Sequence, residues 1–551
     1  MASGRLKRNI GLVGLTFIAV GGMLGSGWLF APMLVSQQAG PAAILSWLVG
    51  GTMMLLIALT FAEVSSLLPI AGGIARIPHF SHGNVVSMAL GFTAWIGYST
   101  NAPIATMVLL QYVAVTFDWV YVGDVDQLRL SPAGFAAAAV IMLVMVLINV
   151  VGVRFFAACN TGLTWFKLLV PLIVGGTILA ADFDFANLTA QGGFAPFGVQ
   201  GILAGVSTGG VIFAFIGFRH AIDLAGEARN PQVTVPLALG LSVVVCIAVY
   251  SVVQIAFLGA LDAEDLANGW DQLTLPHNLG PLAAVASALG LVWLGATIYG
   301  GAIIGPFGDA LVSTGSNARL TLALSRNGFL FPFFDFLSEN GVPLRALVLN
   351  YALGIAFLLL MSFSDLVTLN ISTIVLSLTV GPVAVATLRK QLIGHVRGFT
   401  LPFVEIAAPA AFACSVLILY WAGWKTMGHL AMALVLGCAL FGLRAITDRQ
   451  LFRDLELVHA GWLFCLLPGV WLISYLGNFG GGLGILPFGW DLLACTALAL
   501  GVFALAVRWR LPAEKANRRV AHALADHAGP PHPAAAAAIR DGSGSPGPAS
   551  S

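Results

Sequence analysis

The stretch that decides the fold reads Gly21-Gly-Met-Leu-Gly-Ser-Gly-Trp28, and it lies near the middle of an apolar segment from Ile10 to Gln37. That segment is long enough to cross a bilayer, which takes about 20 residues. Four glycines within seven positions oppose a continuous helix, because glycine loses the most backbone freedom on becoming helical. A membrane helix can break only where protein or a wet cavity encloses the freed backbone groups.

Two interpretations of this stretch are open. In the first, the helix is interrupted, and the freed N–H and C=O groups hold a polar or charged small molecule. In the second, the glycines form a small-residue face for close packing of the Gly-xxx-Gly kind, which is common between membrane helices.

The composition restricts the class of protein. Of the 551 residues, 58% are hydrophobic and 9% are charged, whereas a soluble domain has about 25% charged residues. The chain is therefore expected to be a polytopic protein of the lipid bilayer. With a net charge of +1 and no dense basic patch, nucleic acid is not an expected partner. No metal-ligand spacing and no paired catalytic groups stand in the apolar segments, so we predict no metal, no cofactor and no enzymatic activity.

We expect about fourteen membrane spans of roughly 20 residues each. They lie at 11–36, 42–68, 85–116, 132–151, 156–180, 199–222, 235–259, 282–312, 344–363, 366–388, 402–422, 427–443, 460–476 and 489–508. The connections between them form two sets that alternate along the chain. The first set is basic or mixed and holds Arg76, Arg154, Arg229, Arg319, Arg326, Arg345, Arg389, Arg397, Arg444, Arg453, Arg508 and Arg510. The second set is acidic and holds Asp118, Asp124, Asp126, Asp182, Asp184, Asp262, Glu264, Asp265, Asp271, Asp365 and Asp491.

Because arginine and lysine are enriched in cytoplasmic loops, this alternation predicts that both termini are cytoplasmic. We expect a multi-pass protein of the cytoplasmic (inner) membrane. We predict four parts: a cytoplasmic N-terminus at 1–10, a ten-helix core at 11–390, four additional transmembrane helices at 391–511, and a tail at 512–551. The tail is rich in Ala, Pro, Gly, Ser and His, and this composition predicts disorder.

A second interruption is expected in the sixth span, at Phe213-Ala-Phe-Ile-Gly-Phe218, just before the sequence turns polar at Arg219-His220. Gly217 stands alone there among bulky side chains. The sixth span is five spans after the first. Inverted five-span repeats place discontinuous helices at corresponding positions, with the ligand site between them near the midplane.

At these residues the chain resembles the amino acid–polyamine–organocation (APC) transporter superfamily. The resemblance covers about residues 10–345 in the family's order, and it rests on 21–30, Ala62-Glu63 with 69–73, 213–218, 225–231 with Pro236, and 316–319 with 325–328. Fourteen spans, against the commoner twelve, resemble the branch that includes bacterial aspartate–proton symporters. The resemblance implies an all-α polytopic membrane protein with a LeuT-like 5+5 inverted repeat, in which helices 1 and 6 are broken and the core at 11–390 carries transport.

The resemblance also implies a binding site made mainly of backbone. The carboxylate of an amino acid would be held by freed N–H groups of helix 1, since a helix N-terminus carries a partial positive charge. Its ammonium group would be met by freed carbonyls of helices 1 and 6. The rings of helix 6, including Phe218, would cap the pocket or serve as ordinary packing. The implied substrate-binding residues are Gly21, Gly22, Met23, Leu24, Gly25, Ser26, Gly27, Phe213, Ala214, Phe215, Ile216 and Gly217.

Lys167 lies about twelve residues from either end of the fifth span, or about 18 Å from each interface at 1.5 Å per residue. An unpaired charge at that depth costs at least about 2.5–3.5 kcal/mol. One interpretation is a lysine paired for packing. The other is a proton-coupling site, because the resemblance places a similar lysine of proton-driven members between helices 1, 5 and 8.

Four acidic residues are candidates for gating or proton relay. Glu63 and Asp309 are predicted near the cytoplasmic ends of spans two and eight, where an ion pair with a cytoplasmic arginine is the favoured interpretation over a relay. Asp223 and Glu227 belong to the motif that ends span six, and Glu227 is expected to pair with a basic loop residue in an inner gate.

Arg219 and His220 depart from the family pattern, where neutral or acidic residues are usual. A cation there could receive an acidic substrate side chain, which would favour aspartate or glutamate. Alternatively, Arg219 could face the cytoplasm and pair with Asp223, four residues further along one helix face. Asn101 is expected to hydrogen-bond between helices.

The sequence thus predicts an amino acid importer of the cytoplasmic membrane, coupled to protons through Lys167 and working by alternating access. An amino acid exchanger and a non-transporting nutrient sensor on the same fold are the alternatives. The sequence makes no prediction of oligomeric state.

Overall fold

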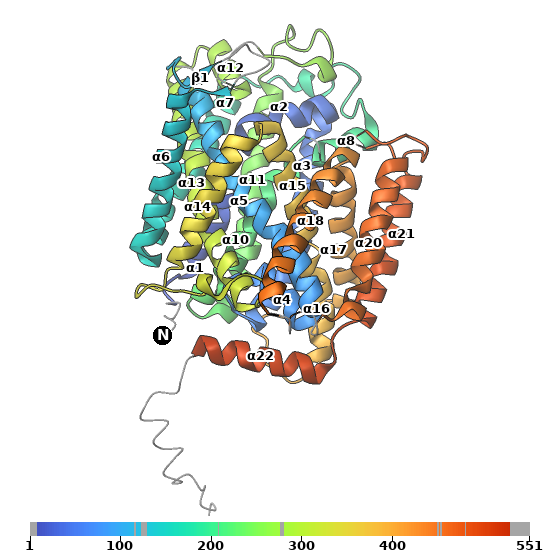
Figure 1. The fold of residues 1–551 in the computed structure, drawn as a ribbon. Coiled ribbons are helices and arrows are strands. Elements are labelled where there is room, and N and C mark those ends of the chain that lie inside the picture. Colours follow the sequence, from blue (N-terminus) through green and yellow to red (C-terminus); the bar gives the residue numbers. More distant parts are fainter. Residues whose placement is uncertain are drawn as a thin grey trace, which may run out of the picture.

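The computed structural model describes residues 8–114, 117–122, 129–207, 209–275, 280–448, 451, 455–479 and 481–528. Figure 1 shows a bundle in which most of the long helices run side by side between two ends of the molecule. Within these residues the one sheet is a two-stranded antiparallel hairpin of β1 (Tyr121–Val122) and β2 (Arg129–Leu130), with Tyr121 opposite Leu130. The protein is therefore all-α, as predicted.

The first five predicted spans form seven helices, because the first span is interrupted and a short helix lies between the second and third. They are α1 (Leu12–Met23), α2 (Gly27–Ala39), α3 (Ala43–Leu67), α4 (Gly73–Ser81), α5 (Asn84–Ala114), α6 (Pro132–Val151) and α7 (Val153–Ala181).

The next five spans contain more interruptions. They are α8 (Gly198–Ser207), α9 (Val211–Phe215), α10 (Arg219–Asp223), α11 (Pro231–Gly259), α12 (Pro281–Ala288), α13 (Val292–Arg326), α14 (Leu344–Leu360), α15 (Phe363–Ser377) and α16 (Val380–Gln391). Short 3₁₀ turns are η1 (Gly40–Ala42), η3 (Phe185–Leu188), η4 (Ile216–Phe218), η5 (Ala225–Glu227), η6 (Trp270–Gln272) and η7 (Pro332–Phe334).

The last part of the described chain holds α17 (Val404–Trp421), α18 (Trp424–Thr447), α20 (Leu457–Leu476), α21 (Trp490–Arg508) and α22 (Ala513–Ala528). Every predicted span coincides with one helix or with consecutive helices. Nine helical segments of the described chain are by themselves long and apolar enough to cross a membrane, or ten if the bent pair in the sixth span counts as one. The protein is an integral membrane protein.

Helices at equivalent positions of the two five-span halves pack against each other. The second span, α3, packs along the seventh, α11, and the third, α5, packs along the eighth, α13. The first span likewise meets the sixth where α1 contacts η4 and α10. This pairing agrees with the predicted 5+5 repeat and brings the two interrupted helices together in the core.

The first interruption lies where the glycine-rich stretch predicts it. Helix α1 ends at Met23, Leu24 leaves the helical region at φ −79° and ψ 64°, and α2 starts at Gly27 with Ser26 as its N-cap. The break therefore occupies Leu24–Ser26. The interpretation as a broken helix is confirmed, and the packing interpretation also holds in part, because the same glycines touch the sixth span.

The second interruption is displaced from its predicted place. The chain bends by 44° between α8 and α9, and Gly210 adopts φ +94°, a left-handed conformation that glycine adopts without strain. At Gly217 the helix only tightens into the 3₁₀ turn η4. A Cβ on Gly217 would collide with the backbone of Gly22 and Met23, so this glycine is needed for close contact with α1.

The predicted disorder after residue 512 is wrong for 513–528, which form α22; residues 529–551 lie outside the described part. Helix α22 lies across the end of the bundle near α4 and α16 (Figure 1). Ala516, Val520 and Ala523 are buried along one face. Composition obscured this helix, because alanine lowers the apparent complexity of the tail but is also the strongest helix former.

Candidate functional site

A small polar cavity lies at the two interruptions. Its lining comes from both broken spans and from the third, eighth and tenth spans. The lining residues are Gly22, Met23, Gly25, Ser26, Gly27, Asn101, Phe213, Ala214, Ile216, Gly217, Arg219, His220, Asp309 and Asn370. Most of the predicted backbone site is therefore brought together around one space.

The start of α2 presents unpaired donors at this cavity. Leu24 N and Gly25 N bond back to α1, and Leu29 N bonds to Ser26 O. The amides of Ser26, Gly27 and Trp28 have no hydrogen-bond partner among the described residues. Together with the partial positive charge of the helix N-terminus, these donors suit a carboxylate.

Several carbonyls predicted for the ligand ammonium are already used. Lys167 Nζ donates to Gly21 O, and Tyr250 Oη donates to Met23 O at 2.6 Å and to Ala214 O at 3.4 Å. Phe213 O accepts the amide at the end of α9. Of the carbonyls predicted for the ligand ammonium, those of Gly21 and Ala214 therefore accept hydrogen bonds from side chains of α7 and α11, and the ammonium site stays a prediction.

Lys167 is buried (2% exposed) between three helices, as predicted. It extends from α7 to Gly21 of α1, and Gly308 of α13 makes room for it, because a Cβ there would stand 3.2 Å from Nζ. Asn160 and Thr164 continue the same buried face of α7, and Thr164 donates to Phe17 O of α1 at 3.1 Å. A polar stripe on α7 thus faces the interrupted helix.

Asp309 is not near a cytoplasmic helix end, contrary to the prediction. Helix α13 continues to Arg326, well past the predicted end at 312, so Asp309 lies at its middle. Its carboxylate lines the cavity next to Gly25, where a Cβ would be 3.2 Å from Oδ2. Its Oδ1 is buried without a partner among the described residues.

Arg219 and His220 line the cavity, so the alternative in which Arg219 faces the cytoplasm is wrong. The guanidinium of Arg219 stacks on Tyr98, with Cζ 3.8 Å from the ring centroid. His220 Nδ1 lies 3.0 Å from Ser316 Oγ, and its ring meets Tyr98 edge-on. Asp223 accepts a hydrogen bond from Tyr98 Oη instead of forming an ion pair within 4.0 Å of Arg219 in the described chain.

Among the predicted ring contacts, only Phe213 lines the cavity. Phe215 packs on Trp47 and Tyr250, and Phe218 packs on Phe61, so both are ordinary core side chains. Leu24 is also buried away from the lining.

Sequence reasoning missed four residues at the site: Tyr98, Tyr250, Ser316 and Asn370. Tyr250 joins the two broken helices, and Asn370 donates to Asn101, to Gly97 O at 2.8 Å and to Thr100 Oγ1 at 3.0 Å. The interhelical role expected of Asn101 is confirmed. The sequence does show polar residues at similar depths in different spans. They could have been assigned to the site only if it had been known which spans are neighbours in the fold.

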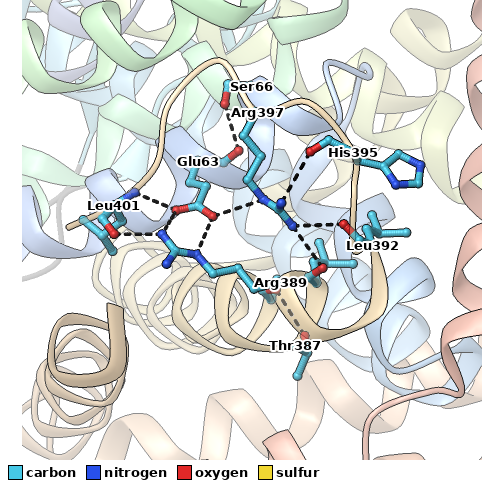
Figure 2. Close-up of polar contacts among 10 residues, drawn as sticks. Glu63, Ser66, Thr387, Arg389, Leu392, His395, Arg397 and Leu401 are labelled. Carbon is cyan, nitrogen blue, oxygen red and sulfur yellow. Dashed lines mark hydrogen bonds and ion pairs between the residues drawn. The ribbon is translucent and has the colours of Figure 1, made fainter. Parts of the chain in front are cut away.

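Glu63 forms the ion pair that was favoured for it. Figure 2 shows its carboxylate between two arginines of the α16 end and the following loop. Arg389 binds it bidentately at 2.6 and 2.8 Å, Leu401 N donates at 2.7 Å, and Arg397 Nε lies 3.4 Å away. Glu63 lies outside the cavity lining.

Glu227 also pairs with an arginine, although this arginine stands within α13 and not in a loop. Arg319 binds it at 2.6 and 3.2 Å and donates to Gly315 O at 2.9 Å. Both side chains are almost fully buried, at 0% and 2% exposure. The chain before α1 is attached here too, because Ile10 N donates to Glu227 O at 3.0 Å and Arg229 N to Ile10 O at 2.7 Å.

Comparison with known proteins agrees with this geometry. The chain is 34% identical over 513 residues to the aspartate-proton symporter of Bacillus subtilis (strain 168), covering 92% of this chain and 98% of that protein. It is 32% identical over 511 residues to the glutamate/serine transporter AimA of the same organism, covering 91% and 94%. It is 29% identical over 410 residues to human cationic amino acid transporter 4, covering 70% and 60%. The amino acid permease family matches residues 10–422, and the chain therefore belongs to this family, within the APC superfamily.

Proposed function

We propose that the protein is a secondary active transporter that imports an amino acid across the cytoplasmic membrane in symport with protons. The observation that carries this proposal is the polar cavity between the two interrupted spans, with a buried lysine beside it. The names of the two B. subtilis relatives, an aspartate-proton symporter and a glutamate/serine transporter, support the same class of substrate and coupling ion.

In this proposal the substrate carboxylate binds at the start of α2, where the amides of Ser26, Gly27 and Trp28 are without partners in the described chain. The substrate ammonium binds at Asp309, whose Oδ1 lacks a partner in the same region. Ser26, Gly27 and Asp309 line one cavity, so the carboxylate and the ammonium of a zwitterion can reach these amides and this side chain together. A charge-assisted hydrogen bond contributes about 1.5–3 kcal/mol, which is sufficient for selective binding.

Lys167 carries the proton. When protonated, its ammonium donates to Gly21 O and joins α7 to α1 just before the break. Loss of the proton removes the positive charge and weakens this contact, so α1 becomes free to move against α7 and α13. Because α1 also lines the cavity, proton transfer at Lys167 is linked to access to the bound substrate.

The proposed topology has residues 11–390 as the transport core, 391–511 as four additional helices, and both termini in the cytoplasm. The start of α1 and helix α22 lie at the same end of the bundle (Figure 1). Arg389, Arg397 and Arg326 belong to connections or helix ends whose basic character favours the cytoplasmic side.

Uptake by purified protein in proteoliposomes tests the proposal. A panel of labelled amino acids is offered with and without an inward-acid pH gradient. We expect at least one amino acid to accumulate above its equilibrium level only with the gradient, and a protonophore to abolish this accumulation.

Two outcomes would contradict the proposal. Uptake that needs an internal amino acid and ignores the pH gradient would identify an exchanger. Binding without any flux, in protein whose monodispersity is verified, would identify a sensor.

A further inference from the structure

The guanidinium of Arg219 is the most conspicuous unpaired charge in the described structure. The residue is fully buried (0% exposed), and Nε, Nη1 and Nη2 have no hydrogen-bond partner among the described residues. Buried polar groups are nearly always paired, and a buried charge without a partner is strongly unfavourable. We therefore expect the buried guanidinium of Arg219 to bind a partner that is not part of the chain.

The way Arg219 is held leaves its donors free. Its contact with the protein is made through the face of the guanidinium, which stacks on the ring of Tyr98 at 3.8 Å. Tyr98 is itself fixed, because its hydroxyl donates to Asp223 and its ring meets His220. Stacking uses the π face of a guanidinium, whereas its five N–H groups point outward in the plane. The plane is therefore oriented without any hydrogen bond being used.

Neither of the two nearby carboxylates forms an ion pair with Arg219. Asp223 accepts from Tyr98 and Asp309 lies against Gly25, and the Oδ1 atom of each is buried without a partner among the described residues. Neither comes within 4.0 Å of Arg219 as an ion pair in the described chain.

Arg219 and the start of α2 line the same cavity. The cavity thus has two separate positions for anionic groups, the amides near Ser26 and the guanidinium, and one for a cation, Asp309. A zwitterion with a neutral side chain would fill only the first and the last. A ligand with one ammonium and two carboxylates matches all three.

We propose that Arg219 binds the side-chain carboxylate of the transported amino acid, which makes acidic amino acids the preferred substrates. This inference rests on the proposed function, because it assigns the side-chain end of the same binding site. A planar guanidinium pairs with a carboxylate through two parallel hydrogen bonds, which a neutral amide of equal size does not reproduce.

The test compares isosteric ligands, aspartate with asparagine and glutamate with glutamine, by equilibrium binding and by proteoliposome uptake. For the unaltered protein we expect the acidic member of at least one pair to bind on the order of 100-fold more tightly. Arg219→Gln should remove that preference through weaker binding of the acid, with the neutral ligand affected only a few-fold. Arg219→Lys keeps the positive charge but loses the planar pair of N–H donors. It should retain roughly a tenth of the affinity that the unaltered protein has for the acidic ligand.

Arg518→Gln serves as the matched control, because Arg518 is 77% exposed on α22 and its one ion pair within the described part of the chain is with Glu514. It should leave both ligand pairs unchanged. If the protein prefers neutral amino acids and Arg219→Gln keeps that preference, the inference is overturned while the proposed function stands.

If Arg219→Gln and Arg219→Lys both lose all ligands equally although they remain monodisperse, Arg219 serves the scaffold or gate and not the substrate side chain. Failure of every amino acid to bind or move in the unaltered protein would instead remove the proposed function itself.

Discussion

Buried charges are treated in opposite ways in two regions of this molecule. At the proposed cytoplasmic end, Glu227 and Glu63 are each bound bidentately by an arginine, at 2.6–3.2 Å and 2.6–2.8 Å. Around the cavity, Arg219 has no ion pair in the described chain and Asp309 has an oxygen without a partner there. Similar side chains at similar burial therefore differ in whether the protein itself supplies the counter-charge.

The difference separates structural charges from functional ones. A buried pair with all its hydrogen bonds made is costly to break, because removing one partner leaves the other charge uncompensated. Charges without a fixed partner contribute little to stability but remain available to a ligand or a proton. We therefore expect substitutions at the cytoplasmic end to lower stability first, and substitutions around the cavity to lower transport first.

The largest effect is expected for Lys167→Ala. This change removes the ammonium that joins α7 to Gly21 of α1, so accumulation driven by a pH gradient should fall to background. The thermal midpoint in detergent should change little, since no carboxylate forms an ion pair with Lys167 in the described chain. Flux assays in proteoliposomes, with Lys390→Ala on the exposed side of α16 as the control, measure this directly.

Unchanged gradient-driven accumulation in Lys167→Ala would contradict the coupling role. A large loss of thermal stability would instead assign Lys167 to the structural class, and the comparison between the two regions would fail.

The next largest effect is expected for Glu227→Gln. It leaves the guanidinium of Arg319, only 2% exposed, without its carboxylate. Breaking such a pair costs about 3–5 kcal/mol. Thermal denaturation followed by fluorescence-detected size exclusion should show a clear drop, whereas Arg219→Gln, which leaves no ion-pair partner behind, should be close to the unaltered protein.

Equal losses of stability in Glu227→Gln and Arg219→Gln would break the comparison. Arg219 would then belong to the scaffold, whatever its effect on substrate preference.

The spans and the first interruption were predictable because hydropathy and glycine act locally. The four glycines at 21–27 favour a break at this place, although a packing face of a continuous helix was also consistent with them. The second interruption was misplaced by about seven residues, since Gly209-Gly210 and Gly217 offer the same local signal. Only contact with Gly22 decides that Gly217 is a packing glycine, and that contact is not visible in the sequence.

The sequence predicted which backbone segments line the cavity, but not most of the side chains around it. Asp309 was misplaced because hydropathy ended its span at 312, whereas tertiary packing continues α13 to Arg326. Tyr250 and Asn370 were missed because their roles depend on which spans become neighbours. Arg219 illustrates the same limit, since its spacing from Asp223 favoured an ion pair facing the cytoplasm, and the structure instead stacks Arg219 on Tyr98 in the cavity lining.

A smaller loss is expected for Glu63→Gln. Its carboxylate has three donors at 2.6–2.8 Å, but Arg389 is 29% exposed and can return to water when released. We expect a destabilisation of about 1–3 kcal/mol, measured by the same thermal assay. Gln keeps one acceptor oxygen, so Glu63→Ala should be worse than Glu63→Gln. The reverse order would mean that the charge at this position is not what holds α3 to the loop after α16.

The smallest effect is expected for Glu456→Gln at helix α22. Glu456 receives Lys515 and Arg519 of this helix at 2.6 and 2.7 Å and the amide of Asn84 at 2.8 Å, but Lys515 is 48% exposed. The half-exposed pair with Lys515 contributes only up to about 1 kcal/mol. Arg519 is 16% exposed and lies at the edge of the bundle, so it can reach water when it is released, and the loss of global stability should be small. The attachment of α22 should weaken locally, and hydrogen exchange of its amides should rise several-fold.

Glu514→Gln is the matched control, because Glu514 is 80% exposed and its one ion pair among the described residues is with Arg518, on the same helix. Faster exchange in Glu456→Gln but not in Glu514→Gln would place Glu456 among the structural charges of the cytoplasmic end. If both variants exchange like the unaltered protein, the helix is held by its apolar face at Ala516 and Val520, and its ion pairs are incidental. Paired charges would then contribute to stability inside the bundle but not at its edge, because water there competes with each partner for the hydrogen bonds.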